Sequence, residues 1–260
     1  MSFVETFAAQ GCLVVDRLFD PALIEQVHGE YRRQYAAFDP ADLPLHMKVG
    51  EGRLHLPMRM TGPLLDPAFY AHPLLMRMIA SLLGDTFLID NVNCVVALAG
   101  AGEQRIHMDH NSLFPEQRDV GDRAPPYAVT VAIPLIDLDE ATGTTRLFPG
   151  SLAAASDADG NPPAFGGDIK PFVKRGGCFL MDYRLWHHGL ANRSDVDRPI
   201  LYIVYSREWF TDVRNFKKHS RLLVDASELE RIPIEHRSLF RRLSAQGLLD
   251  LSIKQVLGQA

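Results

Sequence analysis

The middle of the chain consists of short apolar segments separated by turn residues, and several of these segments alternate apolar with polar positions. Six or seven such segments lie between residues 86 and 210: 86–98, 104–110, 127–137, 144–151, 168–176, 177–183 and 198–210. They are rich in Val, Ile, Leu, Phe and Tyr, and no helical pattern separates them. Consecutive strands of this kind predict a β-sandwich or barrel and not an alternating α/β sheet.

Helical spacing of apolar residues flanks this strand-rich region on both sides. Residues 12–15 predict a short strand, and residues 21–38 predict a helix with Asp20 as its N-terminal cap. Residues 72–84 predict a second helix that ends on a glycine. The pattern from 225 to 257 is again helical.

The segment 40–70 is rich in Pro, Gly and Met without a sustained period, which predicts irregular structure. The chain contains no internal repeat and no low-complexity linker. We therefore predict one domain over residues 1–260, with a β-core at about 86–212 and helices at both ends.

Composition excludes some functions. The chain has 260 residues, of which 47% are hydrophobic, and a net charge of -5. Its Lys and Arg residues are scattered, so nucleic acid is not expected as the main partner. A small molecule is expected instead, and the oligomeric state stays open.

Three cysteines, Cys12, Cys94 and Cys178, lie far apart in apolar segments, and we expect buried thiols in a reducing cytoplasm. The first residues lack the pattern of a signal peptide. The apolar runs are shorter than the roughly 18 residues that a membrane helix needs. We therefore expect a soluble, cytoplasmic protein without a membrane partner.

A histidine and an aspartate stand two residues apart in the segment 104–110. If this segment is a strand, His107 and Asp109 lie on the same face and offer two ligands for a metal ion. The pair alone is weak support, because chance supplies roughly one His-x-Asp in a chain of this kind. A histidine paired with an aspartate at a strand edge explains it equally well.

Two adjacent histidines farther along the chain strengthen the metal hypothesis. Two imidazoles and one carboxylate on one side of a metal form the triad that binds non-haem Fe(II) and leaves positions open for other ligands. Either His187 or His188 can complete the triad. Neighbours on a strand face opposite ways, and the periodicity does not reveal the register.

Arg198 begins the next predicted strand, after a turn at 189–197. If the two strands pair antiparallel, Arg198 faces the residue that ends the first one. A guanidinium beside an iron site can bind a small dicarboxylate through two parallel hydrogen bonds, which points to 2-oxoglutarate. The alternative is a salt bridge from Arg198 to Asp195 or Asp197.

Three segments carry a longer pattern: His107-Met108-Asp109, TGTTRLFPGS at 142–151 and HGLANRSDVDR at 188–198. In this order and spacing they resemble the phytanoyl-CoA dioxygenase family of Fe(II)- and 2-oxoglutarate-dependent oxygenases. The opening at 7–27 is also similar to the family's N-terminal strand and helix, so the resemblance spans nearly the whole chain. It implies a double-stranded β-helix, or jelly roll, with the metal inside the mouth of the barrel and helices outside.

The resemblance also implies roles for individual residues. It makes His107, Asp109 and His188 the iron ligands and Arg198 the partner of the cosubstrate's distal carboxylate. It favours His188 over His187 because Gly189, Asn192 and Arg198 follow His188 at the intervals of the family pattern. Gln104 and Thr145 match a glutamine and a threonine that lie near the metal and the cosubstrate.

The chain departs from the family pattern in three places. Gly143-Thr144-Thr145 replaces Gly-Pro-Thr, Leu152 replaces a histidine, and Leu190 replaces a serine found in some members two residues after the distal histidine. The metal site stays intact, but carboxylate binding beyond Arg198 stays open. The presence of Asp109 disfavours halogenation, since related halogenases have a small residue there.

The implied reaction consumes 2-oxoglutarate and O2, releases succinate and CO2, and hydroxylates a C–H bond of a small organic or acyl-type substrate. Ascorbate is the reductant expected to support it in vitro. Desaturation, epimerisation or cyclisation would use the same residues. The segments 45–62 and 111–126 and the region after Trp209 are expected to select the substrate.

Two other functions fit the same residues. A cupin-like protein would bind a metal or a small acid without turnover, and it would form no succinate. A hydrolase would hold zinc in the triad and act without oxygen. The hydrolase leaves Arg198 and Thr145 unexplained.

Overall fold

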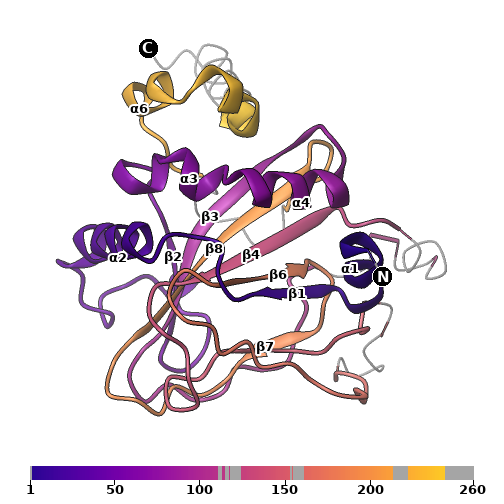
Figure 1. Ribbon diagram of the computed structural model, residues 1–260. Coiled ribbons are helices and arrows are strands. Elements are labelled where there is room, and N and C mark those ends of the chain that lie inside the picture. The colour runs from indigo at the N-terminus through magenta and orange to yellow at the C-terminus, as the bar shows by residue number, and fades with distance from the viewer. Residues whose placement is uncertain are drawn as a thin grey trace, which may run out of the picture.

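Within the part of the chain that the structure describes, six antiparallel strands form the main sheet of this computed structural model (Figure 1). In order across the sheet they are β1 (Cys12–Val15), β6 (Cys178–Asp182), β4 (Ala128–Pro134), β8 (Arg198–Arg207), β3 (Phe87–Ala97) and β2 (Arg53–Pro57). A second sheet pairs β5 (Thr145–Leu147) with β7 (His187–Gly189). The described residues are 2–110, 113, 114, 117, 124–152, 154, 161–212 and 222–243.

Helices cover one face of the main sheet, and β7 lies on its other side (Figure 1). The α-helices are α1 (Phe3–Gln10), α2 (Pro21–Tyr35), α3 (Pro67–Tyr70), α4 (Pro73–Leu83) and α6 (Ala226–Arg231). Short 3-10 helices are η1 (Leu45–Met47), η2 (Gly62–Leu65) and η3 (Ile234–Phe240). This arrangement confirms the predicted jelly roll with helices packed outside.

The two longest helices begin where the sequence predicts them. The Asp20 carboxylate accepts a hydrogen bond from the backbone N–H of Ala22 at 2.9 Å, which caps α2. At the start of α4, His72 Nδ1 accepts from the N–H of Leu74 at 3.3 Å. Each helix then places a stripe of apolar side chains against the sheet, and this burial contributes most of the stability of helices this short.

β8 is one of the two central strands of the main sheet. Its side chains point alternately into the apolar core and into a cavity on the other face. Leu201, Ile203 and Tyr205 are buried in the large apolar cluster under the helices. Tyr202 and Val204 point the other way and line the cavity. One strand thus contributes to packing with one face and to a site with the other.

A bulge interrupts the pairing of β3 with β8. The register steps from Ile89 opposite Tyr205 to Asn91 opposite Val204, so Asp90 is an extra residue without a partner on β8. An extra residue reverses the side-chain alternation. Ile89 therefore packs in the apolar core, whereas Asn91 faces the cavity.

Two segments predicted as strands form isolated bridges instead. In 104–110, the backbone N–H of Gln104 donates to the carbonyl of Gly189, and His107 pairs with His187. The first segment advances three residues between these contacts while β7 advances two, so no regular ladder forms. In 168–176, Ile169 bridges to Leu147 and Arg175 bridges to Gly177, and between them Pro171 lacks the N–H needed to continue a ladder.

The structure contains several elements that were not expected, among them α1, β2 and, within 40–70, η1, η2 and α3. α1 begins in a capping box, in which the side chain of Glu5 accepts from the backbone N–H of Ser2 and the side chain of Ser2 accepts from the backbone N–H of Glu5. β2 lies within the segment predicted as irregular. The sequence pattern did not predict it, because five residues of strand are too few to show a period among prolines and glycines. In the C-terminal region, helical turns are present in α6 and η3, and residues from 244 onward lie outside the described chain.

The three cysteines are buried free thiols, as expected from their apolar surroundings. Burial raises the pKa of Cys12 to about 11 and that of Cys178 to about 12. Both thiols therefore stay protonated and unreactive at neutral pH. None of the described helices is long and apolar enough to span a membrane.

The packing of α2 predicts that substitutions on its buried face destabilise the protein more than substitutions on its exposed face. Ile24 has no exposed surface, and Ile24→Ala should lower the free energy of unfolding by about 2–5 kcal/mol, because it leaves a cavity under the helix. Gln26→Ala, on the exposed face, should change it by less than about 0.5 kcal/mol. Chemical denaturation measures both values, and equal losses would contradict this packing.

Candidate functional site

A cavity of about 330 Å³ lies between the main sheet and the β5–β7 pair. Side chains of β2, β3, β4 and β8 form one wall, and the segment 104–109 with β5 and β7 forms the other. All six residues selected from the sequence lie in this region, and five of them line the cavity: Gln104, His107, Asp109, Thr145 and Arg198. The sixth, His188, does not.

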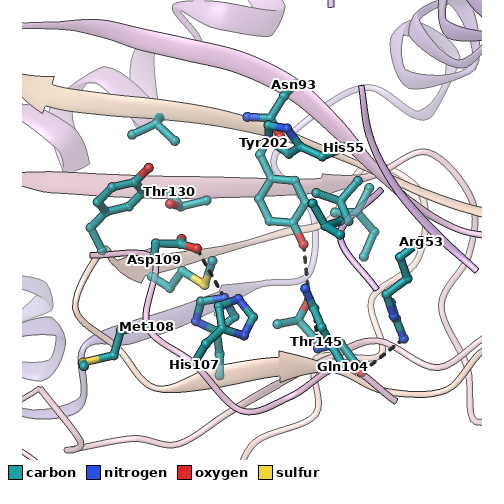
Figure 2. A pocket seen from close by; sticks show the side chains of 18 of the residues that line it. Arg53, His55, Asn93, Gln104, His107, Met108, Asp109, Thr130, Thr145 and Tyr202 are labelled. Atoms are coloured by element: carbon teal, nitrogen blue, oxygen red, sulfur yellow. Dashed lines mark hydrogen bonds and ion pairs between the residues drawn. The ribbon is translucent and has the colours of Figure 1, made fainter. Parts of the chain in front are cut away.

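Among the described residues, one group of side chains could hold a metal ion, and it lies in this cavity. One ligand atom each from His107, Asp109 and His187 lie within 4.8 Å of one another. His187 Nε2 is 3.6 Å from an oxygen of Asp109, and the two imidazole rings are 4.5 Å apart between centroids. Figure 2 shows Asp109 above His107 on the same side of the cavity.

The backbone fixes the tautomer of both histidines. His107 Nδ1 is 2.8 Å from the carbonyl of Arg105, and His187 Nδ1 is 2.9 Å from the carbonyl of Leu185. A carbonyl oxygen only accepts, so in each neutral ring Nδ1 must carry the proton. The lone pair is then on Nε2, where a metal would bind.

The expectation that His188 joins this group is corrected in favour of His187. On β7, His187 lies opposite Leu147 and His188 lies opposite Arg146, so the two histidines face opposite sides. The His188 ring stacks on Phe148 at 5.9 Å, away from the cavity. His187 is placed by two backbone hydrogen bonds of 2.9 Å with His107, a partner that the sequence pattern did not reveal.

Burial sets the charges of the group. It raises the pKa of Asp109 to about 6, with nearby His107 acting in the opposite direction. Burial and the neighbouring His107 lower the pKa of His187 to about 3. At neutral pH the site therefore presents one carboxylate and a neutral imidazole of His187, the forms that bind metals.

Arg198 lies at one end of the cavity and is 3% exposed. Its Nη1 donates to the carbonyls of Thr142 at 2.9 Å and Leu190 at 3.0 Å. The alternative salt bridge is not formed among the described residues, and Asp197 accepts from the backbone N–H of Ala99 instead. The guanidinium is thus held by neutral oxygens.

A second buried arginine was missed by the sequence reasoning. Arg53 of β2 is 2% exposed, and its Nη2 donates to the carbonyls of Gly102, Gly189 and Leu190. The Leu190 carbonyl therefore accepts from both Arg53 and Arg198. The available signal was the alternation in 53–57, which places Arg53 on the face opposite its leucines.

The two guanidiniums form a strongly cationic end of the cavity. Burial and the charge of Arg53 lower the pKa of Arg198 to about 10, and burial also lowers the pKa of Arg53. The Nε of each arginine is buried without a hydrogen-bond partner among the described residues. Two buried cations with unused donors favour an anion.

Gln104 and Thr145 border this cationic end. Gln104 Oε1 accepts from the N–H of Gly189 at 3.1 Å, and the Thr145 hydroxyl is 3.3 Å from that of Tyr202. A Cβ on Gly189 would lie 2.6 Å from Arg53 Nη1, so the glycine makes room for the arginine. Since His187 is the ligand candidate, Gly189 and not Leu190 is the residue two positions after it.

The segments expected to select the substrate contribute unequally. From 45–62, Val49, Arg53 and His55 line the cavity. Most of 111–126 and the basic stretch 214–221 lie outside the described residues. Trp209 is exposed on the surface.

Comparison with known proteins identifies a family and a fold for this chain. The sequence model of the family described as "Phytanoyl-CoA dioxygenase (PhyH)" matches residues 7–200. A structure described as "Non-heme monooxygenase, ThoJ-Ni complex" is similar with a TM-score of 0.60 and 19% identity, covering 98% of this chain and 99% of that one. The structure of the epimerase SnoN in complex with Fe3+, alpha ketoglutarate and nogalamycin RO is similar with a TM-score of 0.57 and 16% identity, covering 79% of this chain and 82% of that one. The structure of AviO1 from Streptomyces viridochromogenes Tue57 has a TM-score of 0.59 and 16% identity, covering 79% of this chain and 94% of that one.

These similar structures share the fold, and the family match extends over most of the chain, including both halves of the site. The protein therefore belongs to the phytanoyl-CoA dioxygenase family.

Proposed function

We propose that this protein is an Fe(II)- and 2-oxoglutarate-dependent dioxygenase that oxidises a C–H bond of a small molecule. The observation that carries the proposal is the presence, in one cavity, of a His-Asp-His group and two buried guanidiniums that have no carboxylate partner among the described residues. The first suits a divalent metal, and the second suits a dianion.

The metal part of the proposal rests on the donor set. Two imidazole nitrogens and one carboxylate oxygen are the ligands that non-haem Fe(II) oxygenases use, with the remaining positions open. His107, Asp109 and His187 would hold the iron. Their Nδ1–H bonds to backbone carbonyls orient both imidazoles before any metal binds.

The cosubstrate part rests on the arginines. Arg198 and Arg53 would bind the distal carboxylate of 2-oxoglutarate, since a guanidinium matches a carboxylate with two parallel hydrogen bonds. Gln104 and Thr145 would offer polar contacts between the arginines and the metal ligands. The complex of SnoN with Fe3+ and alpha ketoglutarate, a protein of similar fold, supports the assignment.

When bound, the iron supplies the oxidising chemistry, in which substrate C–H, 2-oxoglutarate and O2 give hydroxylated product, succinate and CO2. The protein's own residues bind and orient. The arginines fix one end of the cosubstrate, and the Thr145 and Tyr202 hydroxyls border it.

Hydroxylation is the outcome proposed first, and epimerisation is the second candidate because SnoN is described as an epimerase. Succinate formation from 2-oxoglutarate separates both from a binding protein without turnover. Activity that persists under strict anaerobiosis would indicate a hydrolase instead.

The first prediction concerns the two adjacent histidines. Anaerobic addition of Fe(II) and 2-oxoglutarate should produce the weak visible charge-transfer band of the chelate. The band should be lost in His187→Ala and retained in His188→Ala, because only the first removes a ligand. Asp109→Ala should also lose it. Retention in His187→Ala, or absence of a band in the wild type, would contradict the proposed site.

The second prediction concerns the arginines. Arg53→Met and Arg198→Met should each raise the dissociation constant for 2-oxoglutarate about 10- to 150-fold, the equivalent of one lost charge-assisted hydrogen bond. Titration of the same band measures it. Arg146→Met is the control, since Arg146 pairs with Asp168 and should change the value less than about twofold. An unchanged affinity in Arg53→Met would remove that residue from the cosubstrate site.

The third prediction concerns stability without metal. Because burial raises the pKa of Asp109 to about 6 from 3.8, the folded state keeps a proton that the unfolded chain loses, and stability falls as the pH rises between these values. Asp109→Asn lacks this titration. Relative to wild type, it should gain about 1–3 kcal/mol between pH 4 and pH 6.5. Denaturation with a chelator present measures this, and a pH-independent difference would oppose the assigned shift.

A further inference from the structure

The cavity face of the main sheet changes character from one end to the other. Arg53 of β2 pairs with Ala97 of β3, and Ala97 pairs with Arg198 of β8. These three residues form the first row across the strands, and we call it the cationic row because it contains both arginines. The following rows are His55, Val95 and Ile200, then Asn93 and Tyr202, then Asn91 and Val204. Four residues of β-strand span about 13 Å, so Asn93 lies that far along β3 from the cationic row.

A chain of polar contacts runs through the far end of this face. The guanidinium of Arg242 pairs with the carboxylate of Asp90. Asn91 Nδ2 donates to Asp90 at 3.1 Å, and Asn93 Nδ2 donates to Asn91 Oδ1 at 2.7 Å. Asp90, Asn91 and Asn93 are all buried.

The carboxylate at one end fixes the direction of both amides. An ionised Asp90 beside a guanidinium only accepts, so Asn91 must turn its NH2 group toward Asp90 and its oxygen toward Asn93. Asn93 must then turn its NH2 group toward Asn91. The Asn93 carbonyl oxygen remains, and among the described residues no donor is assigned to it.

The bulge makes this arrangement possible. It inserts Asp90 between two paired positions, so that Asp90 reaches Arg242 of the C-terminal segment while Asn91 and Asn93 both line the cavity. Figure 2 shows Asn93 next to His55 and Tyr202, across the cavity from Gln104. Three polar side chains within four residues, at 90, 91 and 93, do not serve the apolar core of a buried strand.

We propose that Asn93 is a specificity residue, whose Oδ1 accepts a hydrogen bond from an N–H or O–H group of the substrate. The substrate class is a small amide or alcohol and not a long apolar acyl chain. The cavity volume of about 330 Å³, which the cosubstrate shares, is at the low end for ligand pockets. The inference rests on the proposed function, because it assigns the cationic row to the cosubstrate.

The test uses two probes that differ by one donor. N-Methylacetamide has an N–H group, and N,N-dimethylacetamide lacks it. Each is titrated into anaerobic protein loaded with Fe(II) and 2-oxoglutarate, and paramagnetic broadening of the probe's methyl NMR signals gives its dissociation constant. For a ligand with five heavy atoms, binding at about 0.1 M or tighter is expected.

N-Methylacetamide should bind saturably and about 2- to 13-fold more tightly than N,N-dimethylacetamide, the range of one net hydrogen bond. Asn93→Leu should abolish this preference while the 2-oxoglutarate band persists. Val95→Ala, on the same wall, should keep the preference. If Asn93→Leu does not fold, Asn93→Ala takes its place.

Three results would overturn the inference: no saturable binding of N-methylacetamide up to about 0.1 M, equal binding of both amides, or a preference that survives in the Asn93 variant. The band reports the proposed function separately. Its absence in the wild type counts against the cofactor assignment, whereas a normal band without discrimination between the amides counts against Asn93 alone.

Discussion

Two guanidinium groups buried side by side are the constraint around which the site is arranged. Arg53 and Arg198 come from distant parts of the chain, lie in one row of the main sheet and share the carbonyl of Leu190. Backbone carbonyls satisfy only part of their donors, and neither has a carboxylate partner among the described residues. Gly143 and Gly189 leave room for them, since a Cβ on either would lie within 2.7 Å of a guanidinium nitrogen. Such an arrangement is costly unless an anion enters.

The group of His107, Asp109 and His187, called the metal group here, and the cationic row both favour the binding of a dianion once a metal ion is present. The two guanidiniums outweigh the single carboxylate of Asp109, and a divalent cation would increase the excess of positive charge. A dicarboxylate that chelates the metal and reaches the arginines offsets both in one step, in a cavity where charges are weakly screened. The electrostatics therefore favour 2-oxoglutarate more strongly once the metal is bound, which gives a physical reason for an ordered assembly of the site.

Local pattern predicted most of the fold but only part of the site. The periodicity of 86–98 and 198–207 and the caps of α2 and α4 are properties of neighbouring residues, so the sequence reveals them. The choice between His187 and His188 depends on pairing with β5 and with His107, contacts between distant segments. Arg53 was missed for the same reason, because its role depends on β2 pairing with β3.

The residues that break local rules are the informative ones. Asparagine and aspartate are disfavoured in strands, yet β3 carries Asp90, Asn91 and Asn93 in its buried middle. A strand selected only for packing would have apolar residues there, as the adjacent strand β8 has at Ile203 and Val204. These polar residues, which are unfavourable for packing, lie at and next to the bulge, where the side chains of β3 turn toward the cavity. Because proteins tend to accept such local conflicts at functional positions, the polar end of the sheet and the arginine row are best understood as two binding surfaces on one face, with the metal group across the cavity from them.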